Sequence, residues 1–340
     1  MNILYCGDKN IEDGLLISVL SLLNTAEEEL HIYVLTMHLE YEGKECLPVR
    51  DEFIDWLDGM VREKNCQKQK KTDELKSADV KGRIPESQPE KMVTKEAIAE
   101  RIQKPGADES ERWSGMEGVE KMPGVKESFV KKIDLSEEFA RNLPIPNMQT
   151  RFTPCCMLRL FADEIPELPN RILYLDTDIV CRRDISEFYH QDMEGFELAG
   201  VPDYYGRWFF HRKRWKFWKW DYLNSGVLLL NMEEIRKTGL FAKCRDLCAA
   251  KEMFMPDQSA LNKLATAKKI CPRRFNDQRK LHEDTVIQHF TTSFRFFPWI
   301  RTVSVKPWDV ERMHEVLKLH EYDDLLEEYV GLRESRRTSE

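Results

Sequence analysis

Residues 2–6 (NILYC), 11–23 (IEDGLLISVLSLL) and 30–35 (LHIYVL) decide the fold class of this 340-residue chain. The first and third stretches are short, apolar runs that are typical of strands. In the second, apolar residues recur at the 3.6-residue spacing of a helix face, after a polar turn at residues 7–10. Strand, helix and strand in succession predict a right-handed βαβ unit within a parallel sheet. The loops at the carboxyl ends of these strands are the expected ligand-binding edge.

Later apolar runs extend this α/β pattern. Strands are expected at residues 129–133, 171–175, 197–201 and 225–230, and a helix at residues 152–165. Two more helices are expected to start where an Asp or Asn precedes a Glu by three residues, at Asp184 with Glu187 and at Asn231 with Glu234.

The composition changes at residues 66–128, which are rich in Lys, Glu, Ser, Pro and Gly and contain a single Trp. Such a segment buries too little apolar surface to offset the entropy that it loses on ordering. We expect a surface insertion, disordered or loosely helical, with a short helix at residues 94–103. The domain would then span residues 1–308 around this insertion, and residues 309–340 would form a charged, amphipathic helical tail.

Composition also excludes several classes of protein. The net charge of -8 argues against a general nucleic-acid binder. No run of apolar residues is long enough to cross a membrane, and the start of the chain lacks the pattern of a signal peptide. The nine cysteines form no C-x-x-C pair and are expected to be reduced, mostly buried thiols, with a reactive Cys155-Cys156 pair as the less favoured alternative. We therefore expect a cytoplasmic protein.

Asp176-Thr177-Asp178 directly follows the predicted strand at residues 171–175. An isolated Asp-x-Asp is more often a pair of solvated or capping carboxylates. Here the strand delivers it to the ligand-binding edge, and alternate residues of an extended chain point to the same side. Two adjacent acids favour a cation, and a divalent ion with oxygen ligands suits a diphosphate. The triplet therefore predicts a metal site that holds a diphosphate.

Six short motifs add to this triplet. They are YCGDKN (residues 5–10), TRF (150–152) with Arg159-Leu160, ILYLDTD (172–178), NSGVLLLN (224–231), PDQSALN (256–262) and KPW (306–308). In this order the motifs resemble glycosyltransferase family 8, which comprises retaining galactosyl- and glucosyltransferases such as those that build lipopolysaccharide. The resemblance implies a glycosyltransferase A-type α/β fold, with a Rossmann-like mixed sheet flanked by helices.

The resemblance also implies a metal site and a donor site. Asp176, Asp178 and His289 would bind Mn²⁺, with Mg²⁺ less favoured because nitrogen is a poor magnesium ligand. Otherwise, His289 would be a hydrogen-bonded histidine of the core. The residues that would contact the UDP-sugar are Asp8 and Asn10 at uridine and ribose, Arg159, Asp176 and Thr177 at the donor, and Lys306 at the diphosphate.

One feature departs from the family pattern. His289 and Lys306 are 17 positions apart, with Phe-rich sequence and no glycine between them, whereas the family has both within a few residues. Either the loop is longer in this chain or one of the two residues is misassigned.

At the reacting sugar, the resemblance implies Asp257 and Gln258, although Asp257 after Pro256 also fits a helix N-cap. Glutamine is a poor nucleophile, which favours front-face substitution over the covalent intermediate of retaining hydrolases. In the front-face route, the departing phosphate accepts the proton of the acceptor. Asp203 and Asn224 match the acceptor side.

Residues 207–220 (RWFFHRKRWKFWKW) are a basic and aromatic stretch in an acidic chain. Such a stretch suits peripheral contact with the inner face of a membrane, a lipid-linked acceptor or sugar stacking. The alternative is an aromatic flap that packs on the domain.

The sequence therefore predicts a retaining hexosyltransferase that moves glucose or galactose from a UDP-sugar to a saccharide or glycolipid. A sugar nucleotidyltransferase is less favoured, because residues 7–10 are not a Gly-rich basic loop. A non-catalytic nucleotide-sugar-binding protein is also less favoured, because the metal and donor positions are all filled. The acceptor, the choice between glucose and galactose, and the oligomeric state stay open.

Overall fold

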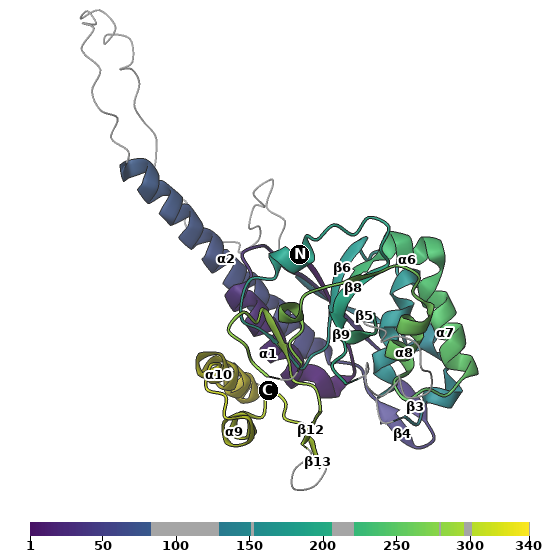
Figure 1. Ribbon diagram of the computed structural model, residues 1–340. Helices are drawn as coiled ribbons and strands as arrows, with labels where there is room; N and C mark the ends of the chain where they lie inside the picture. Colours follow the sequence, from purple (N-terminus) through teal and green to yellow (C-terminus); the bar gives the residue numbers. More distant parts are fainter. Residues whose placement is uncertain (83–128, 151–152, 206–220, 279, 296–300, 340) are drawn as a thin grey trace, which may run out of the picture. The chain divides into compact units, whose positions relative to one another are not determined.

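A mixed seven-stranded sheet forms the centre of the fold, with strand order β10–β8–β9–β6–β1–β2–β5 (Figure 1). Its strands are β1 (Asn2–Cys6), β2 (His31–Thr36), β5 (Phe129–Asp134), β6 (Arg171–Leu175), β8 (Leu198–Pro202), β9 (Leu223–Asn231) and β10 (Lys268–Ile270). Strands β1, β2, β5 and β6 run parallel, whereas β9 runs antiparallel to β6 and β8. All six strands expected from the sequence are confirmed to within two residues.

The structure is a computed structural model that describes residues 1–82, 129–150, 153–205, 221–278, 280–295 and 301–339. The chain separates into two units, Met1–Asn65 with Glu127–Glu340, and Cys66–Lys126. In the second unit, residues 66–82 are the end of helix α2 (Asp51–Gly82). The short helix predicted at residues 94–103 lies outside the described residues.

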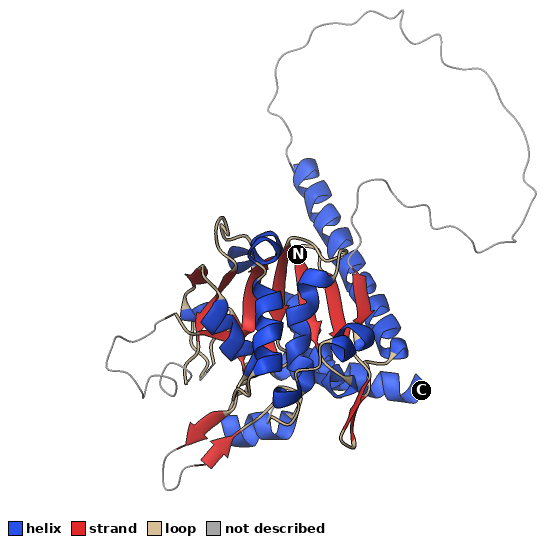
Figure 2. Cartoon of the chain, turned by 90° about the vertical axis from the view of Figure 1, so that its right-hand side faces the viewer, coloured by secondary structure: helices blue, strands red, loops and turns tan. Residues whose placement is uncertain are grey.

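Helices cover both faces of the sheet (Figure 2). One layer contains α1 (Glu12–Thr25), the first part of α2 and α10 (Asp323–Ser339). The other contains α3 (Ser136–Arg141), η3 (Pro154–Glu164), α6 (Met232–Thr238), α7 (Leu240–Ala250) and α8 (Pro256–Leu264). Because successive strand residues point to opposite faces, Ile3 and Tyr5 pack in the first layer and Leu4 packs in the second.

Short elements complete the domain. Among the described residues, three antiparallel pairs are β3 (Leu39–Tyr41) with β4 (Lys44–Cys46), β7 (Ile179–Cys181) with β11 (Ile287–His289), and β12 (Ser293–Arg295) with β13 (Arg301–Val303). The single turns of helix are η1 (Lys9–Ile11), η2 (Ile145–Asn147), α4 (Ser186–Tyr189), η4 (Arg273–Phe275), α9 (Val310–Arg312) and the π-helical η5 (Met313–Leu317).

The helix starts expected from capping pairs have different outcomes. Asn231 caps α6 as predicted, because its Oδ1 accepts a hydrogen bond from the Glu234 backbone N–H at 3.3 Å. The capping box at Asp184 is wrong. Helix α4 starts two residues later, at Ser186, and the Glu187 side chain pairs with Arg274 instead of folding back. Glu187 thus forms an ion pair with a distant residue in place of the hydrogen bond that a capping box would make at the start of its own helix.

The helix expected at residues 152–165 is present as η3, but it is a 3₁₀-helix along its whole length. Residues three positions apart lie on the same face of a 3₁₀-helix. Cys155, Leu158 and Phe161 form such a face, and all three are buried. Arg151 and Phe152 lie outside the described residues.

The predicted C-terminal helical segment is confirmed, and it belongs to the first core layer. Met313, Tyr322, Leu326 and Tyr329 are buried in it. The Tyr329 hydroxyl also donates a hydrogen bond to Asp13 of α1 at 2.8 Å. Among the described helices, none is long and apolar enough to span a membrane.

All nine cysteines have free thiols. A hydrogen bond with Cys46 and burial raise the pKa of Cys155, and burial raises the pKa of Cys156. Both thiols therefore stay protonated, which argues against the reactive alternative for this pair.

Leu173 lies at the centre of β6, between β1 and β9, and is completely buried. We predict that Leu173→Ala lowers the free energy of unfolding by roughly 2–5 kcal/mol, because it leaves a cavity beneath α1. Urea denaturation measures the change. Asp246→Ala, on the exposed face of α7, is the control and should change stability by less than about 0.5 kcal/mol. An equal effect of both substitutions would contradict the assignment of Leu173 to the core.

Candidate active site

Four chain segments meet at one edge of the sheet. Strands β1 and β6 are parallel and adjacent, so the loops after Cys6 and Leu175 leave on the same side. Strand β9 is antiparallel to β6, with Val227 opposite Leu175, so β9 begins at this edge. Pro202, the last residue of β8, pairs with Leu223 of β9 at the same edge. The sheet thus gathers most of the motifs predicted to be functional.

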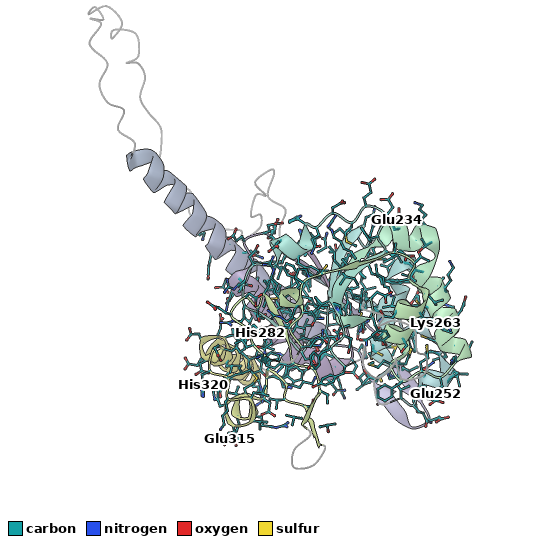
Figure 3. The ribbon with its side chains drawn as sticks, viewed as in Figure 1. Glu234, Glu252, Lys263, His282, Glu315 and His320 are labelled. Atoms are coloured by element: carbon teal, nitrogen blue, oxygen red, sulfur yellow. The ribbon has the colours of Figure 1, made fainter. Side chains whose placement is uncertain are left out.

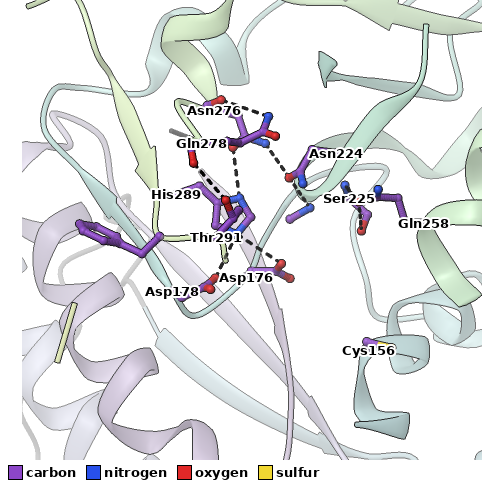
Figure 4. A network of polar contacts seen from close by, with 12 residues as sticks. Cys156, Asp176, Asp178, Asn224, Ser225, Gln258, Asn276, Gln278, His289 and Thr291 are labelled. Carbon is purple, nitrogen blue, oxygen red and sulfur yellow. Dashed lines mark hydrogen bonds and ion pairs between the residues drawn. The ribbon is translucent and has the colours of Figure 1, made fainter. Parts of the chain in front are cut away.

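Asp176, Asp178 and His289 converge at this edge (Figure 4). The Nε2 atom of His289 lies 3.1 Å from Asp178 Oδ1 and 3.7 Å from Asp176 Oδ2. One ligand atom from each residue lies within 4.8 Å of the others. The β7–β11 pair places His289 opposite Ile179, the residue after Asp178. Two carboxylates and an imidazole are thus arranged around one point, as a divalent metal site requires.

Gly226 allows this close approach. A Cβ atom at this position would lie 2.5 Å from Asp176 Oδ2 and would overlap the His289 ring. Its backbone also accepts a hydrogen bond from the Asp176 N–H at 2.8 Å. Any side chain at residue 226 would therefore separate the histidine from the carboxylate.

Asn276 orients His289, and the sequence analysis did not identify it. Its Oδ1 lies 3.2 Å from His289 Nδ1, while its amide donates to Asn224 Oδ1 at 2.9 Å. Because this oxygen can only accept, it favours a proton on Nδ1 and leaves Nε2 facing the two carboxylates, where the neutral imidazole can bind a metal. No local motif marks Asn276, because the contact joins residues 13 positions apart.

Lys306 reaches the same carboxylates. Its ammonium group forms an ion pair with Asp178 and donates to the Phe290 carbonyl at 3.3 Å. The structure therefore brings His289 and Lys306 together although 17 positions separate them, and strands β12 and β13 lie between them in the chain. Trp308 follows in contact with α1, where a Cβ on Gly14 would lie 2.7 Å from its ring.

The charges of this cluster are coupled. Burial by itself would raise the pKa of Asp178, but Lys306 and His289 hold it far below its ordinary value. Burial would lower the pKa of His289, but Asp178 and Asp176 raise it above its ordinary value. A proton on His289 and the Lys306 ammonium thus offset the two carboxylates when no other cation does so.

Arg159 is buried in η3, so the ion pairs that it forms are not on the surface. Its guanidinium lies 3.2 Å from Asp176 Oδ1 and 3.4 Å from Asp257 Oδ2. It also stacks 3.7 Å from the centre of the Tyr174 ring, and the Tyr174 hydroxyl donates to Asp176 at 2.6 Å. Burial opposes the charge of Arg159, but Tyr174, Asp257 and Asp176 raise its pKa. Arg159 therefore joins the Asp-x-Asp loop to the start of α8.

The residues expected at the reacting sugar form a second network. Gln258 accepts a hydrogen bond from the Ser225 N–H at 2.9 Å, and its amide donates to Asp203 Oδ2 at 3.1 Å. Asn224 donates to the same oxygen at 2.9 Å. The N-cap alternative for Asp257 is wrong, because Met255 is the N-cap of α8. The Asp257 carboxylate instead contacts Arg159 and the Ser225 hydroxyl.

Asp8 and Asn10 follow β1 at the same edge. Asp8 is buried, and its Oδ1 accepts from the Asn10 backbone N–H at 2.9 Å, which is ordinary turn chemistry. Asn10 has an exposed side chain. Thr177 contacts α1, because a Cβ on Gly14 would lie 2.9 Å from its carbonyl oxygen. The basic and aromatic stretch at residues 207–220 lies outside the described residues.

Comparisons with known proteins agree with this architecture. A model of the family described as Glycosyl transferase family 8 matches residues 115–311, more than half of the chain. Lipopolysaccharide 1,2-glucosyltransferase of Escherichia coli strain K12 is 28% identical over 163 residues, which are 42% of this chain and 48% of that protein. Glycosyltransferase GlyA of Streptococcus pneumoniae is 32% identical over 110 residues, which are 32% of this chain and 14% of that protein. The chain thus aligns with less than half the length of either relative.

Solved structures show the same fold. The galactosyltransferase LgtC in complex with donor and acceptor sugar analogues superimposes with a TM-score of 0.56 at 14% identity, covering 97% of this chain and 96% of that one. This similarity confirms the glycosyltransferase A-type α/β fold that the sequence motifs implied. Because the family model covers most of the sheet and the candidate site, the chain belongs to glycosyl transferase family 8.

Proposed function

We propose that this chain is a retaining hexosyltransferase that transfers glucose or galactose from a UDP-sugar to a saccharide or a lipid-linked saccharide. The observation that carries the proposal is the convergence of Asp176, Asp178, His289 and Lys306 at the carboxyl edge of the sheet. Such a cluster can hold a metal-bound diphosphate, and the relatives named above are glycosyltransferases.

The ligand set favours Mn²⁺. Two carboxylate oxygens and one imidazole nitrogen fit Mn²⁺ better than Mg²⁺, which binds nitrogen poorly. Asn276 presents the His289 Nε2 lone pair, and Gly226 leaves room for the close approach. When bound, such an ion would supply positive charge that offsets the charge of the diphosphate and of the departing UDP. Magnesium is the alternative.

Lys306 would add a positive charge beside the diphosphate. In the described structure its ammonium group is paired with Asp178. A cation bound to Asp178 would compete for that carboxylate, which would leave Lys306 able to bind a phosphate oxygen. A charge fixed in a partly buried site stabilises the leaving group without reorganisation of solvent.

The second network supports front-face substitution. Gln258 is held at both its oxygen and its nitrogen, and an amide is a poor nucleophile. Asp257 is occupied by Arg159 and Ser225. Neither residue is therefore suited to a covalent glycosyl-enzyme, and a departing phosphate that takes the proton of the acceptor needs no protein base. Asp203, directly after β8, and Asn224, on β9, would bind sugar hydroxyls.

The proposed activity is tested by UDP release from UDP-glucose and UDP-galactose, with Mn²⁺ or with a chelator. We expect metal-dependent release from at least one donor and none from Asp178→Asn.

Lys306→Ala should lower kcat by about 10²-fold, the usual effect of losing a group that stabilises developing charge. Lys263→Ala, on the exposed face of α8, is the matched control and should retain activity.

Two outcomes would contradict the proposal. Exchange of pyrophosphate into UTP would indicate a nucleotidyltransferase. Binding of a UDP-hexose without release of UDP, in any metal tested, would indicate a non-catalytic binding protein.

We expect Mn²⁺ to raise the Tm of the native protein, and we expect Gly226→Ala to abolish this increase, because the added methyl group separates His289 from Asp176. Differential scanning fluorimetry measures the increase. Gly59→Ala is the matched control, since a Cβ at Gly59 of α2 meets no other atom and should leave the Mn²⁺ response intact. A normal response in Gly226→Ala would show that the metal binds elsewhere.

Metal binding should weaken at low pH. Burial lowers the pKa of His289, but Asp178 and Asp176 raise it above its usual 6.5 overall, and only the neutral imidazole binds a metal. We expect the affinity for Mn²⁺, measured by calorimetry, to fall by about tenfold per pH unit below the pKa of His289. Asp178, with its lowered pKa, stays ionised over this range. His289→Gln removes the titrating group, so its affinity should be lower and almost independent of pH; an unchanged slope would exclude His289 as a ligand.

A further inference from the structure

A group of three side chains of the kind that can ligate a metal lies at the start of α10. His314 Nε2 is 2.7 Å from Asp323 Oδ1, and His320 Nδ1 is 3.4 Å from Asp323 Oδ2. The two imidazole rings stack with their centres 4.7 Å apart and their planes at 12°. His320 projects beside α10 in Figure 3. None of the three residues belongs to the candidate active site.

The backbone around these side chains is anchored. Met313 and Tyr322, which directly precede His314 and Asp323, are both buried in the core. The Leu319 N–H donates to the Met313 carbonyl at 3.2 Å and closes the turn between the two histidines. Buried neighbours therefore fix the backbone that carries His314 and Asp323.

The composition of the group is that of a metal site. One ligand atom from each residue lies within 4.8 Å of the others. Each imidazole has a ring nitrogen within 3.4 Å of a different oxygen of the same carboxylate. Imidazole nitrogen and carboxylate oxygen are ligands that transition-metal ions accept together.

We propose that His314, His320 and Asp323 form a site for a transition-metal ion of the Zn²⁺ class. Two imidazole nitrogens and one carboxylate oxygen are a common protein ligand set for Zn²⁺, and water can fill the fourth position. The side chains are 33%, 66% and 44% exposed, so the ion can enter from solvent. With two nitrogen ligands in place of one, the site should prefer Zn²⁺ over Mn²⁺ more strongly than the Asp176–Asp178–His289 cluster does.

Such an ion would tie the turn at residues 314–320 to the first turn of α10. Helix α10 packs on α1, where Tyr329 bonds to Asp13 and Arg336 lies 3.3 Å from Glu12. The proposed role is therefore structural: the ion stabilises the attachment of the C-terminal helix and takes no part in the transfer reaction.

The test is Zn²⁺ binding by the full chain carrying Asp178→Ala, which disables the active-site cluster. Competition with a chromogenic chelator gives the affinity, and scanning fluorimetry gives the rise in Tm. We expect that adding His320→Ala weakens Zn²⁺ binding by more than about tenfold and removes the rise in Tm. Every variant retains all nine thiols, so binding to cysteine cancels in the comparison.

His190→Ala is the matched control, because His190 is also exposed and lies 2.6 Å from a single carboxylate, that of Glu28. It should leave the affinity unchanged. Asp323→Asn, which keeps the shape of the side chain, should reproduce the loss if His320→Ala perturbs folding by circular dichroism. Equal Zn²⁺ affinity in the Asp178→Ala chain with and without either substitution would overturn the proposal. Because the background is inactive, the result does not depend on the proposed transferase activity.

Discussion

The charge balance around Asp176 and Asp178 is the constraint on which the rest of the site depends. Two carboxylates at the end of one strand are stable together only if cationic groups offset them. Arg159, His289 and Lys306 supply this charge from three separate parts of the chain. The segments that carry them, η3, β11 and the segment after β13, therefore meet at this edge of the sheet.

The antiparallel strand β9 has a particular role in this arrangement. A parallel strand next to β6 would begin at the opposite edge of the sheet, whereas β9 begins beside the Asp-x-Asp loop. It therefore places Asn224, Ser225 and Gly226 against the metal cluster on one side and the Gln258 network on the other. One short segment thus connects the proposed metal site with the proposed site of sugar transfer.

The sequence predicted strands and helix starts correctly where they depend on neighbouring residues alone. The apolar runs of β1, β6 and β9 and the Asn231 cap depend on neighbouring residues only. The capping box at Asp184 was wrong because Glu187 has a distant partner, Arg274, that competes with the local bond. The N-cap interpretation of Asp257 was wrong for the same reason, since Arg159 and Ser225 take its carboxylate. Asn276 and Tyr174 carried no signal, because their roles exist only through contacts made on folding.

The sequence by itself determined the α/β class, the strands and the identity of the acidic and cationic residues, because apolar periodicity and motif chemistry are properties of short segments. Only the tertiary structure decided that His289 and Lys306, 17 positions apart, share the Asp178 carboxylate. These contacts depend on strand pairing and helix packing between remote parts of the chain, and spacing along the sequence does not specify such distances.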